Sequence, residues 1–344
     1  MSDSATDVFD SGAVRLGTNV VCDGFVEGYN FRIQTHVHDD HMADFNTSKG
    51  RQDIFMSPET FALLNAFLNV EIPYRSNFYK IQRSVEYKLP DNSKLALLPS
   101  NHMLGSCQVA LELSDGRKVG YSGDFGWPLD EVIQVDELVV DSTYGSPNSI
   151  RGYTQATAEE CLLELVCKRL RYGPVHIYAH RGTVERVLHI IEGNVRVPIL
   201  ASERLIREVK VYQNHGISLG TLDSIDSEEG ISASRQRSYV RLYSKGDGFG
   251  NEPIVDTSIK CSAYMATRST SSPLLSFSEN SFSVALSNHA DFLETLEYIK
   301  ATGARTVITD NTRNHGVELA NAINERLPGV KARPSNNDPP PRWY

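Results

Sequence analysis

Short runs of alternating bulky and polar residues predict a strand-rich first part of the chain. After a mobile start, residues 13–16 and 19–23 form a predicted hairpin with its turn at Gly17, and residues 31–34 form the next strand. Ser57-Pro58-Glu59 predicts the start of a helix, because serine caps helices and proline suits the first helical position. Further strands are predicted at 94–99, 108–113, 118–122 and 138–140.

From residue 145 the pattern changes to strands that alternate with helices. Thr157 and Glu160 predict a capping box for a helix with Leu162, Leu163, Val166 and Leu170 inside. The strands 175–178 and 198–201 are each followed by a predicted helix, which is typical of parallel strands. Polar composition predicts exposed loops, at residues 223–236 and 269–281.

The last part of the chain continues this alternation. We predict strands at 239–243, 259–262 and 282–286, a helix that contains Leu293, Leu296 and Ile299, a strand at 305–309, a helix at 317–327 and an edge strand at 330–332. The Pro-rich residues 336–341 are expected to be loose.

Length and charge limit the classes of protein to consider. A chain of 344 residues exceeds the usual size of one core, so two lobes are expected. The net charge of −9 argues against a passive nucleic-acid binder, although an enzyme with a local basic groove fits it. The sequence contains no apolar run of membrane-spanning length and no secretory signal, so we expect an intracellular protein, cytoplasmic or, in a eukaryote, nuclear. The five cysteines form no Cys-x-x-Cys pair and are interpreted as reduced core thiols.

Three of the ten histidines stand within seven residues, directly after the strand 31–34. His36 and His38 leave the strand on one face, and Asp40 and His41 follow on the next turn. Imidazole and carboxylate together suit zinc and similar divalent ions. A site that stays partly open to water makes a hydrolytic nucleophile available near neutral pH. The pattern His-x-His-x-Asp-His therefore predicts half of a two-metal hydrolytic centre, the alternative being a polar turn that is rich in histidine.

Other predicted strands end in further ligand-type residues. His102 follows the strand 94–99 in a loop where Gly105 permits close approach of the backbone. Asp124 follows the strand 118–122, Asp141 follows the strand 138–140, and His289 stands between a strand and a helix. We expect these side chains to meet at one rim of a sheet.

These motifs, in this order, resemble the β-CASP branch of the metallo-β-lactamase fold nucleases. The resemblance is carried by His36-x-His38-x-Asp40-His41, His102 in His-x-x-Gly-Ser, Asp124 in Ser-Gly-Asp-Phe, Asp141 in Asp-Ser-Thr-Tyr-Gly and His289 in Ser-x-His-Ala-Asp. It implies an α/β fold with a metallo-β-lactamase αβ/βα sandwich, residues 1–144 and 283–344, and an inserted β-CASP α/β domain, residues 145–282. It also implies that nucleic acid binds in a cleft between the two domains.

The resemblance also implies a role for each motif residue. His36, His38 and His102 would hold one zinc ion, Asp40 and His41 a second, and Asp124 would bridge them, with manganese as the alternative metal. Asp141 and His289 would form a carboxylate-histidine pair beside the scissile phosphate. Asp23 would brace the histidine loop, an ordinary Asx turn being the alternative.

The chain departs from the family pattern after the strand 305–309. RNA-directed members have a histidine there that completes the second metal site, whereas this chain has Asp310-Asn311-Thr312. Either Asp310 or Asn311 takes that place, and only Asp310 would be a useful ligand, so the second ion is expected to be held weakly. The DNA-directed Artemis type also lacks the histidine, which favours DNA slightly over RNA. His315 is interpreted as a residue at the start of a surface helix, with compensation for the missing ligand as the alternative.

We therefore predict a metal-dependent nuclease. The alternatives are a ribonuclease of the same branch, a hydrolase of the same fold that acts on other substrates, and a non-catalytic partner subunit. Candidate contacts to the nucleic-acid backbone are His180, Arg181, Arg204, Lys260 and Arg268.

Overall fold

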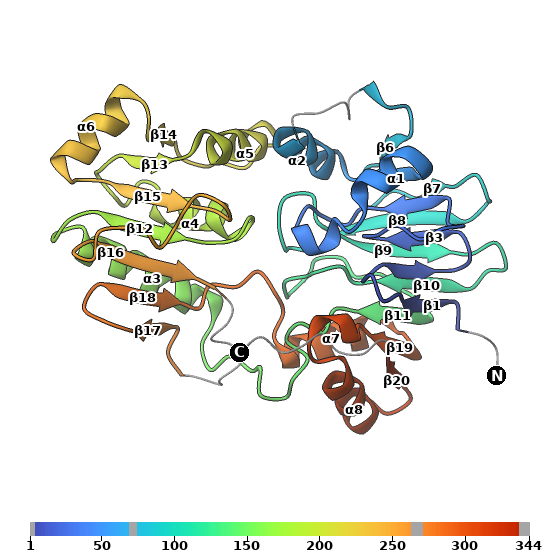
Figure 1. The fold of residues 1–344 in the computed structure, drawn as a ribbon. Helices are drawn as coiled ribbons and strands as arrows, with labels where there is room; N and C mark the ends of the chain where they lie inside the picture. Colours follow the sequence, from blue (N-terminus) through green and yellow to red (C-terminus); the bar gives the residue numbers. More distant parts are fainter. Residues whose placement is uncertain (1–3, 69–73, 263–270, 337–344) are drawn as a thin grey trace. The chain divides into compact units, whose positions relative to one another are not determined.

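The computed structural model describes residues 4–68, 74–262 and 271–336. The chain divides into unit 1, Met1–Ile150 with His289–Tyr344, and unit 2, Arg151–Asn288 (Figure 1). None of the helices in the described ranges combines the length and apolar character needed to cross a lipid bilayer.

Unit 1 contains two sheets of mixed strand direction. The first has the order β1 (Thr6–Val8), β2 (Val14–Leu16), β3 (Val20–Cys22), β4 (Phe31–Ile33), β5 (Asp53–Met56) and β6 (Phe78–Lys80). The second has the order β20 (Lys331–Pro334), β19 (Thr306–Thr309), β11 (Glu137–Val140), β10 (Lys118–Tyr121), β9 (Cys107–Glu112), β8 (Lys94–Pro99) and β7 (Tyr87–Lys88). The helices of this unit are α1 (Phe45–Arg51), α2 (Pro58–Leu68), α7 (Phe292–Thr302) and α8 (Gly316–Arg326).

The two sheets pack face to face over a shared apolar core. Ile33 and Phe55 of the first sheet belong to the same buried cluster as Leu97, Val109 and other residues of the second. A separate buried cluster joins the other face of the second sheet to α7 and α8, through Leu138, Leu296 and Ile323 among others. Arg32 points from β4 to the outer face of the first sheet and bonds Ser48 of α1. This order of layers is consistent with the expected αβ/βα sandwich.

The strand directions bring several strand ends to one rim. In the first sheet β3 and β4 are parallel. In the second, β10, β11 and β19 are parallel, and β8 has the same direction because both β8 and β10 pair antiparallel with β9. The loops after these strands carry the candidate ligands.

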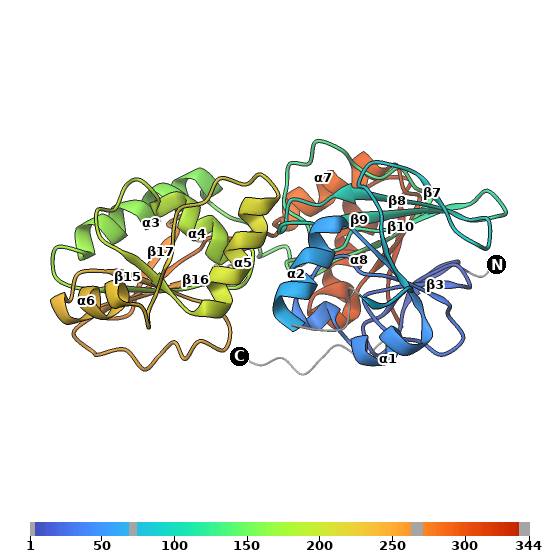
Figure 2. The ribbon, with the colours of Figure 1, turned by 90° about the horizontal axis from the view of Figure 1, so that it is seen from above.

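Unit 2 contains one sheet of seven strands. Its order is β14 (Asp223–Ser224), β13 (Ile199–Ala201), β15 (Val240–Tyr243), β12 (Val175–Tyr178), β16 (Thr257–Cys261), β18 (Ser281–Val284) and β17 (Leu274–Ser276). Every pairing is parallel except that of β17 with β18. The helices are α3 (Gln155–Arg169), α4 (Thr183–Ile191), α5 (Glu203–Asn214) and α6 (Glu228–Gln236), and Figure 2 shows them from a second direction. The predicted alternation of strands and helices is thus confirmed. Its assignment to the β-CASP type stays a prediction.

Several local predictions are wrong. The expected mobile start contains β1, which pairs with β2, and the expected loop at 269–281 contains β17. The expected loop at 223–236 contains β14 and α6, because the Ser227 hydroxyl accepts a hydrogen bond from Gly230 N and caps the helix. The cap of α3 is Thr154, not Thr157, since the Thr154 hydroxyl accepts from the Thr157 amide.

Several predictions of burial are also wrong. Leu163 and Leu170 of α3 and the Cys161 thiol are only half-buried, and Cys167 is exposed. In α3 the buried positions include Leu165, which lies on the same face as Leu162. The predicted positions Leu162 and Val166 are fully buried, so the predicted buried face is confirmed at these two residues.

Arg32 is fully buried and organises the loop after β4. Its guanidinium donates to the carbonyl oxygens of His41, at 3.0 Å, and Ala43, at 2.9 Å, and to the Ser48 hydroxyl, at 2.9 Å. Its Nε donates to Gln34 Oε1 at 3.0 Å. Burial lowers the pKa of Arg32 to about 10, so the group stays charged at neutral pH.

We expect Arg32→Met to lower the free energy of unfolding by roughly 3 kcal/mol, because it leaves several buried acceptors without a donor. Chemical denaturation measures the effect. Arg51→Met is the matched control, since Arg51 is exposed and pairs with exposed Glu27. The control should change stability by less than about 1 kcal/mol. Equal effects of the two substitutions would contradict the structural role of Arg32.

Candidate metal centre

Four side chains meet with the spacing of metal ligands. His36, His38, His102 and Asp124 each present one ligand atom within 4.8 Å of the others. His38 Nδ1 lies 3.1 Å from His36 Nε2 and 3.0 Å from His102 Nε2. Both Nε2 atoms lie 3.6 Å from Asp124 Oδ2. Ligand atoms bound tetrahedrally to zinc at about 2.0–2.1 Å lie about 3.3 Å apart, so the donor set fits such an ion.

Asp23 holds the loop that carries His36 and His41. Its Oδ1 accepts from the Thr35 amide at 2.8 Å, and its Oδ2 accepts from the Thr35 hydroxyl at 2.6 Å. His41 Nδ1 donates to the same Oδ2 at 2.7 Å. The backbone of Asp23 is left-handed, at φ 57°, which aspartate tolerates better than most residues. Asp23 therefore braces the loop.

The same contacts set the tautomer of His36. The Thr35 hydroxyl has one proton and donates it to Asp23, so the hydroxyl accepts from His36 Nδ1, which lies 3.0 Å away. Burial, together with the neighbouring His41, lowers the pKa of His36 well below its ordinary value. The imidazole is therefore neutral, with its proton on Nδ1 and its lone pair on Nε2, as a metal ligand requires.

The His102 loop is fixed by its own hydrogen bonds and by α2. The Ser106 hydroxyl accepts from the amides of His102, at 3.2 Å, and Met103, at 3.1 Å. Gly105 has φ +79°, and a Cβ there would lie 2.6 Å from the Thr60 amide nitrogen. The predicted close approach at Gly105 is thus confirmed, because a larger residue would displace the His102 loop.

Asp124 lies between the histidines from both sheets. Its Oδ1 is 3.2 Å from His41 Nε2, on the opposite side from the contacts of Oδ2 with His36 and His102. Burial raises the pKa of Asp124, but the charges of His41 and His289 outweigh it and keep that pKa well below its ordinary value. Burial lowers the pKa of His41, but Asp124 and Asp23 outweigh it and raise that pKa to about 10. Asp124 therefore carries a negative charge among the clustered histidines.

His289 and Asp141 form a pair beside this cluster. His289 Nδ1 lies 3.5 Å from Asp141 Oδ2, and its Nε2 lies 3.9 Å from Asp124 Oδ2. The other oxygen of Asp141 accepts from the amide and hydroxyl of Thr143. Burial lowers the pKa of His289, but the nearby carboxylates of Asp141 and Asp124 outweigh it and raise that pKa. The segment before α7 anchors this histidine, since the amide of the next residue, Ala290, donates to the Phe125 carbonyl at 2.7 Å.

The residues of the expected second metal site surround an arginine that sequence reasoning missed. Arg313 Nη1 pairs with Asp40 Oδ2, and its Nη2 lies 3.1 Å from His41 Nε2. Asp310 Oδ2 lies 3.5 Å from Arg313 Nε. Burial raises the pKa of Asp310 despite Arg313. Among the described residues, Asp40 and Asp310 belong to none of the three groups with the spacing of metal ligands.

The remaining histidines have ordinary environments. His176 is buried between the Tyr243 hydroxyl, at 2.8 Å, and Asp256, at 3.2 Å. His180, His189 and His215 are exposed. His315 is half-buried at the start of α8, 3.4 Å from Glu318. These positions agree with structural or surface roles.

Two of the candidate backbone contacts in unit 2 pair with acids. Arg181 lies 3.5 Å from Glu208, and Arg204 lies 2.9 Å from Asp247. Lys260 is exposed, and Arg268 lies outside the described residues. A role of these residues in binding nucleic acid stays a prediction.

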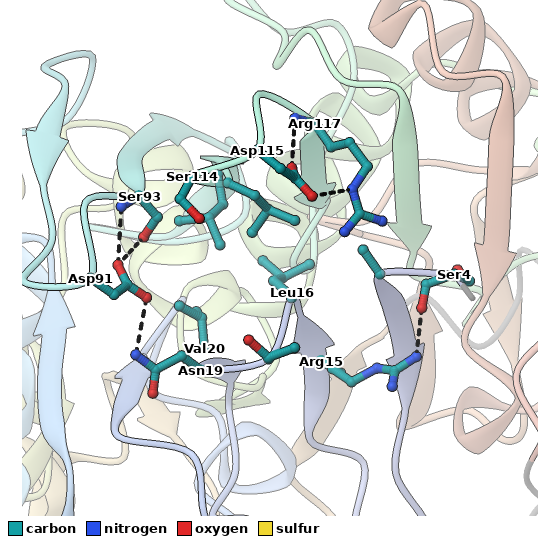
Figure 3. A pocket seen from close by; sticks show the side chains of 15 residues that line it. Ser4, Arg15, Leu16, Asn19, Val20, Asp91, Ser93, Ser114, Asp115 and Arg117 are labelled. Carbon is teal, nitrogen blue, oxygen red and sulfur yellow. Dashed lines mark hydrogen bonds and ion pairs between the residues drawn. The ribbon is translucent and has the colours of Figure 1, made fainter. Parts of the chain in front are cut away.

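A cavity of about 340 Å³ lies at the opposite ends of the strands from the histidines (Figure 3). It is lined by the residues between β2 and β3 and between β9 and β10, among others. Its charged side chains pair locally, Asp91 with Asn19 at 3.0 Å and Asp115 with Arg117 at 2.8 Å. This cavity lacks histidine and has no clustered carboxylates. The candidate site is therefore the cluster of His36, His38, His102 and Asp124 at the other ends of the strands.

Comparisons with known proteins agree with a hydrolase but establish no family. No family model matches the chain. It is 29% identical over 130 residues to an uncharacterized protein in the lig 3′ region of Acidianus ambivalens, which covers 37% of this chain and 92% of that protein. It is 26% identical over 211 residues to an RNase J-like protein of Methanocaldococcus jannaschii, which covers 53% of this chain and 49% of that protein. The chain thus matches about half the length of this second relative.

A solved structure has the same general fold. The crystal structure of a protein of unknown function from Enterococcus faecalis V583 superposes with a TM-score of 0.63 at 13% identity, over 90% of this chain and 80% of that one. This likeness concerns the fold alone. The buried cluster of histidine and aspartate and the distant similarity to an RNase J-like protein together indicate a metal-dependent hydrolase.

We expect His38→Ala to lose the bound metal on dialysis while the fold survives, because His38 supplies a donor from a loop outside the core. Elemental analysis measures the metal, and circular dichroism checks the fold. His189→Ala is the control, since this exposed histidine of α4 lies far along the chain from the cluster. Retention of the full metal content by His38→Ala would contradict the assignment.

Asp23→Asn should weaken metal binding about 10- to 100-fold, the usual effect of losing an outer partner of the ligands. Asparagine keeps the size and tolerates the left-handed backbone, but it cannot accept all four hydrogen bonds that Asp23 accepts, from Gln34, from the amide and hydroxyl of Thr35 and from His41. Competition with a chromogenic chelator measures the affinity. Asp44→Asn is the matched control, because Asp44 is also left-handed, at φ 49°, but exposed. An unchanged affinity in Asp23→Asn would show that the brace does not act on the metal.

Proposed function

We propose that this chain is a metal-dependent phosphodiesterase that cleaves nucleic acid, built on a metallo-β-lactamase sandwich with a β-CASP insert. The observation that carries the proposal is the group of His36, His38, His102 and Asp124, spaced for one metal ion, with the pair of His289 and Asp141 beside it. The sandwich of unit 1 and the similarity to an RNase J-like protein support it.

The four clustered side chains would hold the ion. When bound there, a divalent ion supplies a more acidic water and a positive charge that offsets the charge developing on a phosphate. The neutral tautomer of His36 and the anionic state of Asp124 suit this donor set. Zinc fits the mixed nitrogen and oxygen ligands, and manganese is the alternative ion.

His289 would transfer a proton to the departing oxygen of the phosphodiester. One ring nitrogen lies toward Asp141 and the other toward Asp124, so the ring is oriented across the cluster. Asp141 would hold the proton on Nδ1 and stabilise the imidazolium form. The amide and hydroxyl of Thr143 donate to Asp141 and hold its carboxylate in place, and Asp141 in turn orients the ring of His289.

DNA is the first candidate substrate, because either Asp310 or Asn311, and not a histidine, follows the strand β19, where RNA-directed members have a histidine. RNA is the second candidate, and the similarity to an RNase J-like protein favours it. Cleavage of matched labelled DNA and RNA strands, with and without a 5′ phosphate, tests the proposal. Metal-dependent cleavage of either supports it, with DNA expected to be cut faster. Intact strands of both kinds with metal-loaded protein would contradict it.

We expect His289→Ala to lower turnover about 10²- to 10⁴-fold, the range for a lost general acid, with little change in metal content. A substrate with a more acidic leaving group, such as a nitrophenyl phosphodiester, should lose much less. Measuring turnover on both substrates together with metal content separates the two roles. Loss of the metal in this variant would instead assign His289 to the metal ligands.

A further inference from the structure

We propose that the guanidinium of Arg313 takes the place of a second metal ion, so that the site works with one ion and one fixed cation. This inference rests on the proposed function, because it concerns the same hydrolytic centre. It replaces the expectation of a second, weakly held ion.

Arg313 contacts the side chains that a second ion would need. Its Nη1 pairs with Asp40 Oδ2, and its Nη2 lies 3.1 Å from His41 Nε2, the nitrogen that also lies 3.2 Å from Asp124. A second contact of Nη2 reaches the Asp40 carbonyl at 3.4 Å. The guanidinium therefore contacts both donors of the expected second site, Asp40 Oδ2 and His41 Nε2, which lie 3.7 Å apart.

Asp310 completes the environment of the guanidinium. Its Oδ2 lies 3.5 Å from Arg313 Nε, while its Oδ1 accepts from the amide and hydroxyl of Thr312. Burial opposes the charge of Arg313, but Asp40 and Asp310 outweigh it and raise the pKa of Arg313. Asp310 is thus a partner for an arginine three residues later, which is a different role from that of a metal ligand.

The loop from Asp310 to Gly316 holds Arg313 in place. The Ser142 hydroxyl donates to the Asp310 carbonyl, and the Thr309 hydroxyl donates to the Gly316 carbonyl at 2.6 Å. A Cβ on Gly316 would lie 2.6 Å from Asn311 Cα, so the start of α8 packs against the loop without room for a side chain. With its backbone fixed and only 13% of its side chain exposed, Arg313 has little freedom to leave.

The charge of Arg313 opposes a second ion for a general reason. Guanidinium does not lose its proton in proteins, so a divalent ion bound by Asp40 and His41 would face a permanent positive charge within a few ångströms. The ion would also have to displace Arg313 from Asp40 and leave Asp310 with a buried, unpaired carboxylate. A guanidinium instead supplies one positive charge with donors suited to phosphate oxygens.

Metal stoichiometry tests this inference. Native mass spectrometry of the full chain, with zinc or manganese added in excess, should find one ion in the wild-type protein. Arg313→Gln removes the charge at similar length and should bind a second ion, whereas Arg313→Lys keeps the charge and should bind one. Arg117→Gln is the matched control, because Arg117 is exposed and pairs with Asp115 at the opposite ends of the strands. It should also bind one ion.

Two outcomes would overturn the inference while leaving the proposed function intact. One is a wild-type protein that binds two ions tightly, and the other is Arg313→Gln that folds, as judged by circular dichroism, yet binds only one. The number of ions that the wild-type protein binds tests the inference even if Arg313→Gln does not fold. Absence of any bound ion, together with intact DNA and RNA substrates, would instead contradict the proposed function.

Discussion

The carboxylate of Asp23 is the contact on which the candidate site depends. Asp23 directly follows β3. Its carboxylate accepts hydrogen bonds from the amide and the hydroxyl of Thr35, at the end of the neighbouring strand β4. Through Thr35 it sets the proton of His36, and directly it holds His41. The buried carboxylate of Asp23 thereby fixes the loop after β4, the tautomer of His36 and the orientation of the His41 ring. The lone pair of His36 Nε2 is left directed at the cluster. Arg32 of β4 holds the same loop, because its guanidinium donates to the carbonyl of His41.

The strand directions explain why so many ligand-type residues meet. Loops after β3, β4, β8, β10, β11 and β19 lie at one rim, because the strands before them have a common direction within each sheet. Side chains of these strands form the buried apolar clusters of unit 1. The resulting cluster combines three histidines and Asp124 from both sheets around one point, with His289 at its edge.

Most of this arrangement can be predicted from local patterns. His36, His38 and His102 follow strands with clear alternation, and the motif order limits the fold. Features that depend on distant contacts cannot be read in this way. Arg313 meets Asp40 across 273 positions of sequence, and nothing near Arg313 indicates a partner. The strands β1 and β17 are only three residues long and form through pairing with the strands beside them. The helix α6 depends on the cap at Ser227 more than on an apolar face.

X-ray absorption spectroscopy of the zinc-loaded protein tests the central claim most directly, because it reports the atoms around the ion. The account predicts first-shell nitrogen and oxygen at about 2.0–2.1 Å with the outer-shell scattering of three imidazole rings, and no second metal at the roughly 3.5–4 Å of two-metal sites. Sulfur at about 2.3 Å, or a shell of oxygen atoms without imidazole, would contradict it.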